Sequence, residues 1–283
     1  MHLYFTVFQF FSSLNSQHII GVFDSGAGGL TVLKELIGHF PSLPFIYFAD
    51  NANCPYGPKD TDEIINISTR IINFLLSKGS SMIVVACNTA TASAIDYLRG
   101  HFHIPFIGME PAVKPAALGS KTNSIGILAT EGTFNGRLYQ ETTAKYAANT
   151  NVVYQIGDGL VELVEQGKYY SEEAKELLKK YVQPMLDKNI DHLVLGCTHY
   201  PFFIPILKEI LPEHITIVNP APAVARQTEK VFLESFPLAS KQGDPFVHFY
   251  SSGNGGILKS LVEVIERNEG ITFPNKKFFE IKL

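Results

Sequence analysis

Two of the three cysteines in this chain lie in similar sequence contexts. Cys87 follows the apolar run Met82–Ala86, and Cys197 follows His192–Gly196. Both runs are typical of buried strands, and a helix is expected to begin after each cysteine. A thiolate is favoured at such a strand end by the unpaired amides of the helix. Two thiols from two similar half-molecules could therefore face one ligand from opposite sides.

The residues after the two cysteines offer an amide, hydroxyls and an imidazole: Asn88, Thr89, Thr198 and His199. A single cysteine is often an inert buried hydrophobe, but two in matching positions favour a functional interpretation. His199 could polarise a thiol or donate to a carboxylate, and a histidine bonded to backbone is the alternative. Cys54 stands beside Pro55 in a predicted turn without a counterpart, and we expect it to be structural.

Three further loops contain candidate ligand contacts. Asp24–Gly29 lies between a strand signal and a helix signal, so its amides could hold an anion, although Asp24 could simply cap the helix. Its spacing matches neither the dinucleotide-binding fingerprint nor a P-loop. Pro55, Tyr56 and Gly57 have the composition of a turn. Thr130–Thr133 brings two hydroxyls to the start of a predicted helix, where capping is the alternative.

The elements that must position these loops alternate between strand and helix signals, which is typical of a parallel sheet covered on both faces. Strands are predicted at Ile19–Phe23, Phe45–Phe48, Met82–Ala86, Phe106–Gly108, Ser124–Leu128, Val152–Ile156, His192–Leu195, Ile215–Val218 and Phe246–Tyr250. Apolar spacing predicts helices at Thr31–Phe40, Thr61–Lys78, Ala90–Phe102, Ser171–Lys188, Pro205–Leu211 and Ala223–Phe236. Pro184 is expected to kink or break the helix that contains it.

The two halves of the chain also show a faint internal repeat. Ile20–Gly26 matches Ile125–Glu131, and Cys87 matches Cys197 at nearly the same offset. Chance agreement between buried strands is the alternative, because such strands all have similar compositions. A true duplication would bring the carboxyl ends of both sheets together around a shared ligand site.

Composition agrees with a globular protein that binds a small ligand. The chain has 283 residues, of which 46% are hydrophobic, so two α/β domains are expected. Its net charge of −4 and lack of a basic stripe give no support for binding nucleic acid or an anionic membrane. Three cysteines without framework spacing favour a reducing compartment. The apolar run Leu3–Phe11 lacks the features of a signal peptide, and we interpret residues 1–18 as an N-terminal extension.

Five segments together resemble glutamate racemases of the aspartate/glutamate racemase family: Val22–Thr31, Cys54–Gly57, Ala86–Ala90, Gly108–Ala112 and Leu195–Pro201. The resemblance runs from Ile20 to about Ser252 and implies an α/β fold with two pseudo-symmetric parallel-sheet domains. The first domain would comprise residues 19–112 and 221–283, and the second residues 113–220. The implied activity is cofactor-independent interconversion of L-glutamate and D-glutamate without a metal, supplying D-glutamate for peptidoglycan in the bacterial cytoplasm.

The resemblance also implies roles for individual residues. Cys87 would act on D-glutamate with help from Asp24, and Cys197 on L-glutamate with help from His199. A base on one face of the α-carbon and an acid on the other are what inversion requires. The implied substrate contacts are Asp24, Ser25, Pro55, Tyr56, Gly57, Asn88, Thr89, Thr133, Thr198 and His199.

Three segments depart from the family pattern. Asp50–Asn53 lacks the arginine that often precedes the Cys-Pro-Tyr-Gly motif, Gly157–Glu165 lacks a Cys-Pro pair, and Asn219–Pro220 replaces a commoner Asp-Ser. The role of Glu165, regulation and oligomeric state therefore stay open, with a homodimer as one alternative. Other functions to be tested are a racemase or isomerase for aspartate, a hydantoin or maleate, a cysteine hydrolase using Cys197 and His199, and a plain anion-binding module.

Overall fold

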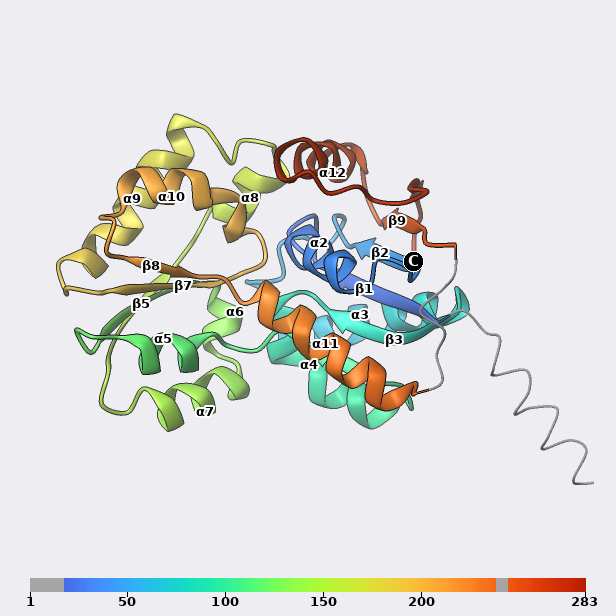
Figure 1. Ribbon diagram of the computed structural model, residues 1–283, viewed down its shortest axis with the longest axis horizontal. Coiled ribbons are helices and arrows are strands. Elements are labelled where there is room, and N and C mark those ends of the chain that lie inside the picture. Colours follow the sequence, from blue (N-terminus) through green and yellow to red (C-terminus); the bar gives the residue numbers. More distant parts are fainter. Residues whose placement is uncertain (1–17, 238–243) are drawn as a thin grey trace, which may run out of the picture.

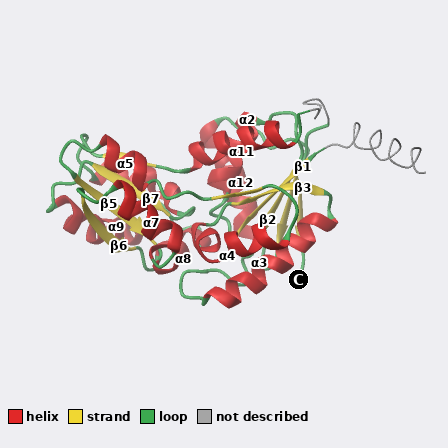
Figure 2. Ribbon diagram, turned by 90° about the horizontal axis from the view of Figure 1, so that it is seen from below, coloured by secondary structure: helices red, strands yellow, loops and turns green. Residues whose placement is uncertain are grey.

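The computed structural model describes residues 18–237 and 244–283, and within them the strands form two parallel sheets. The six-stranded sheet has the order β10-β9-β2-β1-β3-β4 and the four-stranded sheet the order β6-β5-β7-β8. Figure 1 shows the two sheets side by side, each with helices packed around it, and Figure 2 shows the same division from below. Of the expected extension, residues 1–17 lie outside the described residues.

The strand boundaries lie close to those predicted. The first sheet contains β1 (Ile19–Asp24), β2 (Phe45–Ala49), β3 (Ser80–Val85), β4 (Phe106–Gly108), β9 (Val247–Ser251) and β10 (Lys277–Glu280). The second contains β5 (Ser124–Ala129), β6 (Asn151–Ile156), β7 (His192–Gly196) and β8 (Thr216–Val218). The order β2-β1-β3-β4 matches β6-β5-β7-β8, which supports the internal repeat, because Cys87 and Cys197 then follow equivalent strands.

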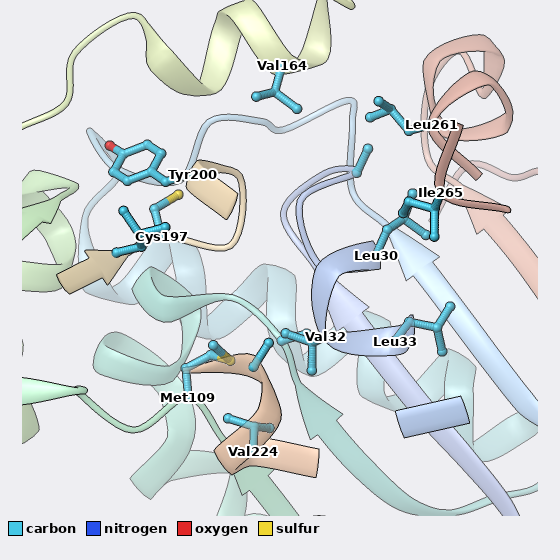
Figure 3. Close-up of a cluster of buried hydrophobic side chains, with 14 of the residues drawn as sticks. Leu30, Val32, Leu33, Met109, Val164, Cys197, Tyr200, Val224, Leu261 and Ile265 are labelled. Carbon is cyan, nitrogen blue, oxygen red and sulfur yellow. The ribbon is translucent and has the colours of Figure 1, made fainter. Parts of the chain in front are cut away.

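Alternating side chains divide the first sheet into two buried faces. One face carries Val22 and Tyr47 and packs against α2 (Leu30–His39), α11 (Ala221–Ser235) and α12 (Gly256–Glu269). Figure 3 shows Leu30 of α2 beside Ile265 of α12 in this cluster. The opposite face carries Phe23 and Val85 and packs against α3 (Thr61–Ser77) and α4 (Asn88–His101). The sheet is therefore rigidly buried on both sides, which fixes the loops at its carboxyl edge.

The second sheet is covered in the same way. Leu128 and Leu195 face α9 (Glu172–Leu186), α8 (Leu160–Glu165) and α10 (Ile204–Ile210), which follows the short 3₁₀ turn η1 (Tyr200–Phe203). Ile127 and Val194 face α5 (Val113–Gly119) and α7 (Arg137–Tyr146), with α6 (Glu131–Phe134) at the inner end. The strands of each sheet fall on the expected sides of residues 112/113 and 220/221, and we propose these positions as the domain boundaries.

Some elements differ from the predictions. The chain runs through Pro184 without a break in α9, which ends at Leu186. We expected a kink or a break at Pro184; a proline near the end of a helix removes a single donor, and no break occurs. Several elements were not predicted from the sequence: α5, α7, α8, α12 and β10.

Candidate active site

Asp24 is the last residue of β1, directly before the loop that leads to α2, and it is fully buried. Its Oδ1 accepts from the Gly26 amide at 2.9 Å and its Oδ2 from the Thr198 hydroxyl at 2.9 Å. The interpretation of Asp24 as the helix cap is wrong, because the N-cap of α2 is Gly29. Burial raises the pKa of Asp24 to about 6, against a lowering effect of nearby His199. The carboxyl is thus held at the point where the two halves of the molecule meet.

Cys87 is the N-cap of α4, as expected for a residue between a strand and a helix. Its sulfur accepts from the Ala90 amide at 3.4 Å and contacts the Ser25 hydroxyl, to which the thiol donates, at 3.6 Å. Burial and, to a lesser extent, the charge of Asp24 raise the pKa of Cys87 to about 12. Without a cation beside it, Cys87 is therefore a neutral thiol at neutral pH.

Cys197 directly follows β7, and its sulfur lies 3.8 Å from Nδ1 of His199. His199 is 1% exposed, and its Nε2 lies 2.7 Å from Oε1 of Glu165. Burial by itself lowers the pKa of this imidazole, but hydrogen bonds to Cys197, Cys54 and Glu165 raise it well above its ordinary value. His199 is therefore an imidazolium at neutral pH, placed between a thiol and a carboxylate.

Glu165, at the end of α8, connects the second half to the first. Besides His199, it accepts from the Ala27 amide at 2.6 Å and from Asn51 Nδ2 at 2.8 Å. Burial would raise the pKa of Glu165, but these hydrogen bonds and the charge of His199 bring it below its ordinary value. The sequence left the role of this residue open, and the structure places it beside the histidine of the second cysteine loop.

Glycines let these side chains approach the loop after β1. A Cβ on Gly28 would lie 2.3 Å from Nδ1 of His199, and a Cβ on Gly26 would lie 2.2 Å from Oε1 of Glu165. A side chain at either position would force His199 or Glu165 to move, so glycine at residues 26 and 28 permits the observed contacts. The glycines of this loop therefore serve the contact between the two halves, which a phosphate-binding interpretation would not explain.

The remaining predicted contact residues lie in two groups. Tyr56 is buried and donates to Oδ2 of Asp50 at 2.6 Å, which holds the turn that contains Pro55 and Gly57. A chain of hydroxyls crosses between the halves, because Thr130 Oγ1 lies 2.9 Å from both Thr89 Oγ1 and Thr133 Oγ1. Thr130 also caps α6, as the alternative interpretation proposed.

Asn88 has a buried side-chain oxygen that a ligand could hydrogen-bond. Its side chain is 8% exposed, and its Oδ1 has no hydrogen-bond partner among the described residues. A buried acceptor without a partner costs free energy unless a ligand or water satisfies it. It lies directly after Cys87, so a donor on a bound ligand is a suitable partner.

Cys54 was expected to be structural, and the structure instead places its thiol in the site. One ligand atom from each of Cys54, Glu165 and His199 lies within 4.8 Å of the others. Burial raises the pKa of Cys54 to about 11. Sequence reasoning missed this position because the contacts join segments far apart in the chain. The only local signal was the Cys-Pro-Tyr-Gly motif itself.

Comparison with known proteins decides the family. The model of the Asp/Glu/hydantoin racemase family matches residues 30–228. The glutamate racemase of Herpetosiphon aurantiacus is 41% identical over 247 residues, which cover 87% of this chain and 97% of that relative. The chain belongs to the Asp/Glu/hydantoin racemase family. This membership weighs against the cysteine hydrolase alternative, although Cys197 does contact His199 and His199 contacts Glu165.

Solved structures of the family show the same fold. A glutamate racemase from Francisella tularensis in complex with D-glutamate has a TM-score of 0.79 and 29% identity, covering 94% of this chain and 98% of that one. An Escherichia coli glutamate racemase in complex with L-glutamate and the activator UDP-MurNAc-ala has a TM-score of 0.80 and 29% identity, covering 94% and 99%. Both alignments extend over the two sheets described above.

No helix in residues 18–237 and 244–283 is both long enough and apolar enough to cross a membrane.

Proposed function

We propose that this protein interconverts L-glutamate and D-glutamate, with Cys87 and Cys197 acting on opposite faces of the α-carbon. The observation that carries the proposal is the placement of both thiols after equivalent strands, β3 and β7. Adjacent residues of one loop contact both cysteine loops, since Ser25 contacts Cys87 and Asp24 accepts from Thr198. Glutamate as the substrate is supported by the glutamate racemases among its relatives.

Inversion needs a base on one face of the α-carbon and an acid on the other. Cys87 as thiolate removes the α-proton of D-glutamate while Cys197 as thiol delivers a proton to the other face, and L-glutamate reacts in the reverse sense. Asp24 assists the first thiol and His199 the second. Each turnover exchanges the protonation states of the two sulfurs, so proton exchange with solvent must restore the starting form before the same enantiomer can react again.

Because Cys87 is protonated at neutral pH, the substrate itself must help to form its thiolate. Its pKa of about 12 leaves little thiolate at neutral pH. The α-ammonium group of glutamate brings the opposite charge, and the unpartnered Oδ1 of Asn88 can accept from it. The hydroxyls of Ser25 and Thr89 and the backbone amide of Thr198 supply donors for the carboxylates, and the resulting carbanion is stabilised by the same fixed dipoles.

The product fits a biosynthetic role. We propose that the D-glutamate is used for peptidoglycan in the bacterial cytoplasm, and that the reaction needs no cofactor. Pro55, Tyr56, Gly57 and Thr133 are proposed as further contacts with the substrate.

The test is incubation of the purified protein, freed of metals and pyridoxal phosphate, with L-glutamate in deuterated water. We expect the circular dichroism signal of glutamate to decay to zero, with deuterium appearing first at the α-carbon of the D-enantiomer. Aspartate, glutamine and alanine should react poorly, because they leave buried polar groups of the site unpaired. Faster turnover of aspartate, or a requirement for pyridoxal phosphate, would overturn the proposal.

A further inference from the structure

We propose that Cys54, Glu165 and His199 form a binding site for a thiophilic divalent cation such as Zn²⁺, and that the bound ion inhibits the enzyme. The three residues offer a thiol sulfur, a carboxylate oxygen and an imidazole nitrogen within 4.8 Å of one another. These are the ligand types that Zn²⁺ takes in proteins. Three protein ligands leave a fourth coordination position for water or a substrate group.

The spacing of the ligand atoms requires little movement. Ligands held about 2.0–2.3 Å from a tetrahedral zinc ion lie roughly 3.5 Å apart, so two ligand atoms at the 4.8 Å limit would need to approach by about 1.3 Å. Nε2 of His199 and Oε1 of Glu165 lie 2.7 Å apart, so these two atoms would separate by about 0.8 Å to admit the ion. The cation would replace the proton between these two atoms and the proton of the Cys54 thiol.

The surroundings hold the ligands in place and leave space between them. Glu165 is fixed by Asn51, which in turn accepts from the hydroxyl of Ser251 at 2.8 Å. Such outer contacts orient metal ligands in known sites. A Cβ on Gly26 would lie 2.2 Å from Oε1 of Glu165 and 3.2 Å from the sulfur of Cys54, so glycine keeps the position beside both ligands clear.

An ion can reach the group from solvent. Cys54 and Glu165 are partly exposed, whereas His199 is buried. Neither Cys87 nor Cys197 is needed as a ligand, so occupation would leave both reacting thiols free. Inhibition would instead come from the loss of the His199 imidazolium beside Cys197. This consequence rests on the proposed function, whereas cation binding does not.

Cobalt(II) titration of the purified, metal-free protein tests the binding site directly. Thiolate coordination gives Co²⁺ an intense sulfur-to-metal absorption band, which we expect for the wild type and for the control variant Cys87→Ser. The band should disappear in Cys54→Ser, and Zn²⁺ should displace Co²⁺ from the wild type. Thermal unfolding of the metal-free variants checks that each one folds.

Several outcomes would overturn the site. They are the absence of the band in the wild type, its persistence in Cys54→Ser, and its loss in Cys197→Ser but not in Cys54→Ser. In the last case the sulfur ligand would be Cys197.

A second measurement tests the inhibition. We expect the Zn²⁺ concentration that halves the racemisation rate to rise about 10-fold or more in Cys54→Ser, with each variant compared with its own metal-free rate. Equal sensitivity of wild type and variant would contradict the inhibition. A protein that gives the predicted cobalt spectrum but does not racemise glutamate would refute the proposed function while leaving the metal site intact.

Discussion

The two cysteine loops follow equivalent strands but have different surroundings. Cys87 lies beside the Ser25 hydroxyl and an amide of its own helix, and the charge of Asp24 helps to raise its pKa. Cys197 lies beside the His199 imidazole, which is bonded to Glu165. One sulfur therefore has a neutral and anionic environment, and the other has a cation next to it.

This difference indicates what a duplicated fold preserves. The strand order fixes where each thiol emerges, and it is the same in both halves. The groups that support each thiol come from loops, which vary more freely than the strands they connect. On the proposed mechanism, kcat and KM for each enantiomer can thus differ although kcat/KM is equal in the two directions. The following variants test that division from the largest expected effect to the smallest.

Removing either thiol should have the largest effect. We expect Cys87→Ala and Cys197→Ala each to lower racemisation on the order of 10⁴-fold, because each step needs its own proton carrier. Each variant should still eliminate HCl from a chlorinated glutamate analogue, since elimination needs a base on one face only. Polarimetry and chloride release measure the two reactions. A single variant that racemises at nearly the wild-type rate would contradict the two-thiol mechanism.

Replacing the supporting residues should separate the two directions. We expect Asp24→Asn to lower kcat more with D-glutamate and His199→Asn more with L-glutamate, each by roughly 10²-fold or more. The equilibrium constant between enantiomers is one, so kcat/KM must stay equal in the two directions while kcat and KM change separately. Equal kcat losses in both directions for both variants would refute the pairing of Asp24 with Cys87 and of His199 with Cys197.

Asp24 should also destabilise the folded protein as the pH rises. Its pKa is about 6 when folded, against 3.8 for the free side chain. The folded state thus binds this proton more tightly, so the stabilising contribution is complete below pH 3.8 and lost as the pH rises through about 6. A shift of this size corresponds to on the order of 3 kcal/mol.

Asp24→Asn removes this titration, so the stability of the variant relative to wild type should increase between about pH 4 and pH 7. Urea unfolding at several pH values measures the difference. A constant difference across this range would show that Asp24 does not titrate there.

Filling the space beside His199 should have a smaller effect. Gly28→Ala places a Cβ 2.3 Å from Nδ1 of His199, and we expect a loss of about 1–3 kcal/mol in unfolding free energy together with a lower kcat. Gly38→Ala in α2 is the matched control, because nothing lies within 4 Å of its Cβ. The control should gain about 0.5–1 kcal/mol from helix propensity. Equal stability of the two variants would contradict the close approach.

The sequence was most informative about the strands. Buried parallel strands are continuous apolar runs bounded by turn residues, so β1, β5 and β7 could be located to within a residue or two. Helix α7 was missed because its buried surface comes mainly from Tyr139, which leaves little periodicity. Helix α12 did carry a readable pattern in Leu258, Leu261, Val262 and Ile265, which the prediction overlooked.

The sequence did not predict every contact in the candidate site, and the reason differs from the one that applies to the helices. Strand ends predicted Cys87 and Cys197 as members of one site, and the structure shows that they follow equivalent strands, β3 and β7. The contacts of Glu165 with Ala27 and Asn51 cross between the two halves, and no local pattern records them. The same is true of Cys54, whose local turn gives no indication that His199 lies beside it. Local sequence therefore locates the loops but does not indicate which loops meet.

The turn that holds Tyr56 is stabilised in part by Ser252, a residue late in the chain that directly follows β9. Asp50 anchors that turn, and its Oδ1 accepts from the hydroxyl of Ser252 at 2.6 Å. A ribosome completes both cysteine loops well before it reaches Ser252 and the strands on either side of it. A nascent or prematurely terminated chain can therefore contain both thiols while Asp50 still lacks the hydrogen bond from Ser252. The contacts of Asp50 with Tyr56 and Asn53, by contrast, need no residue of the C-terminal strands.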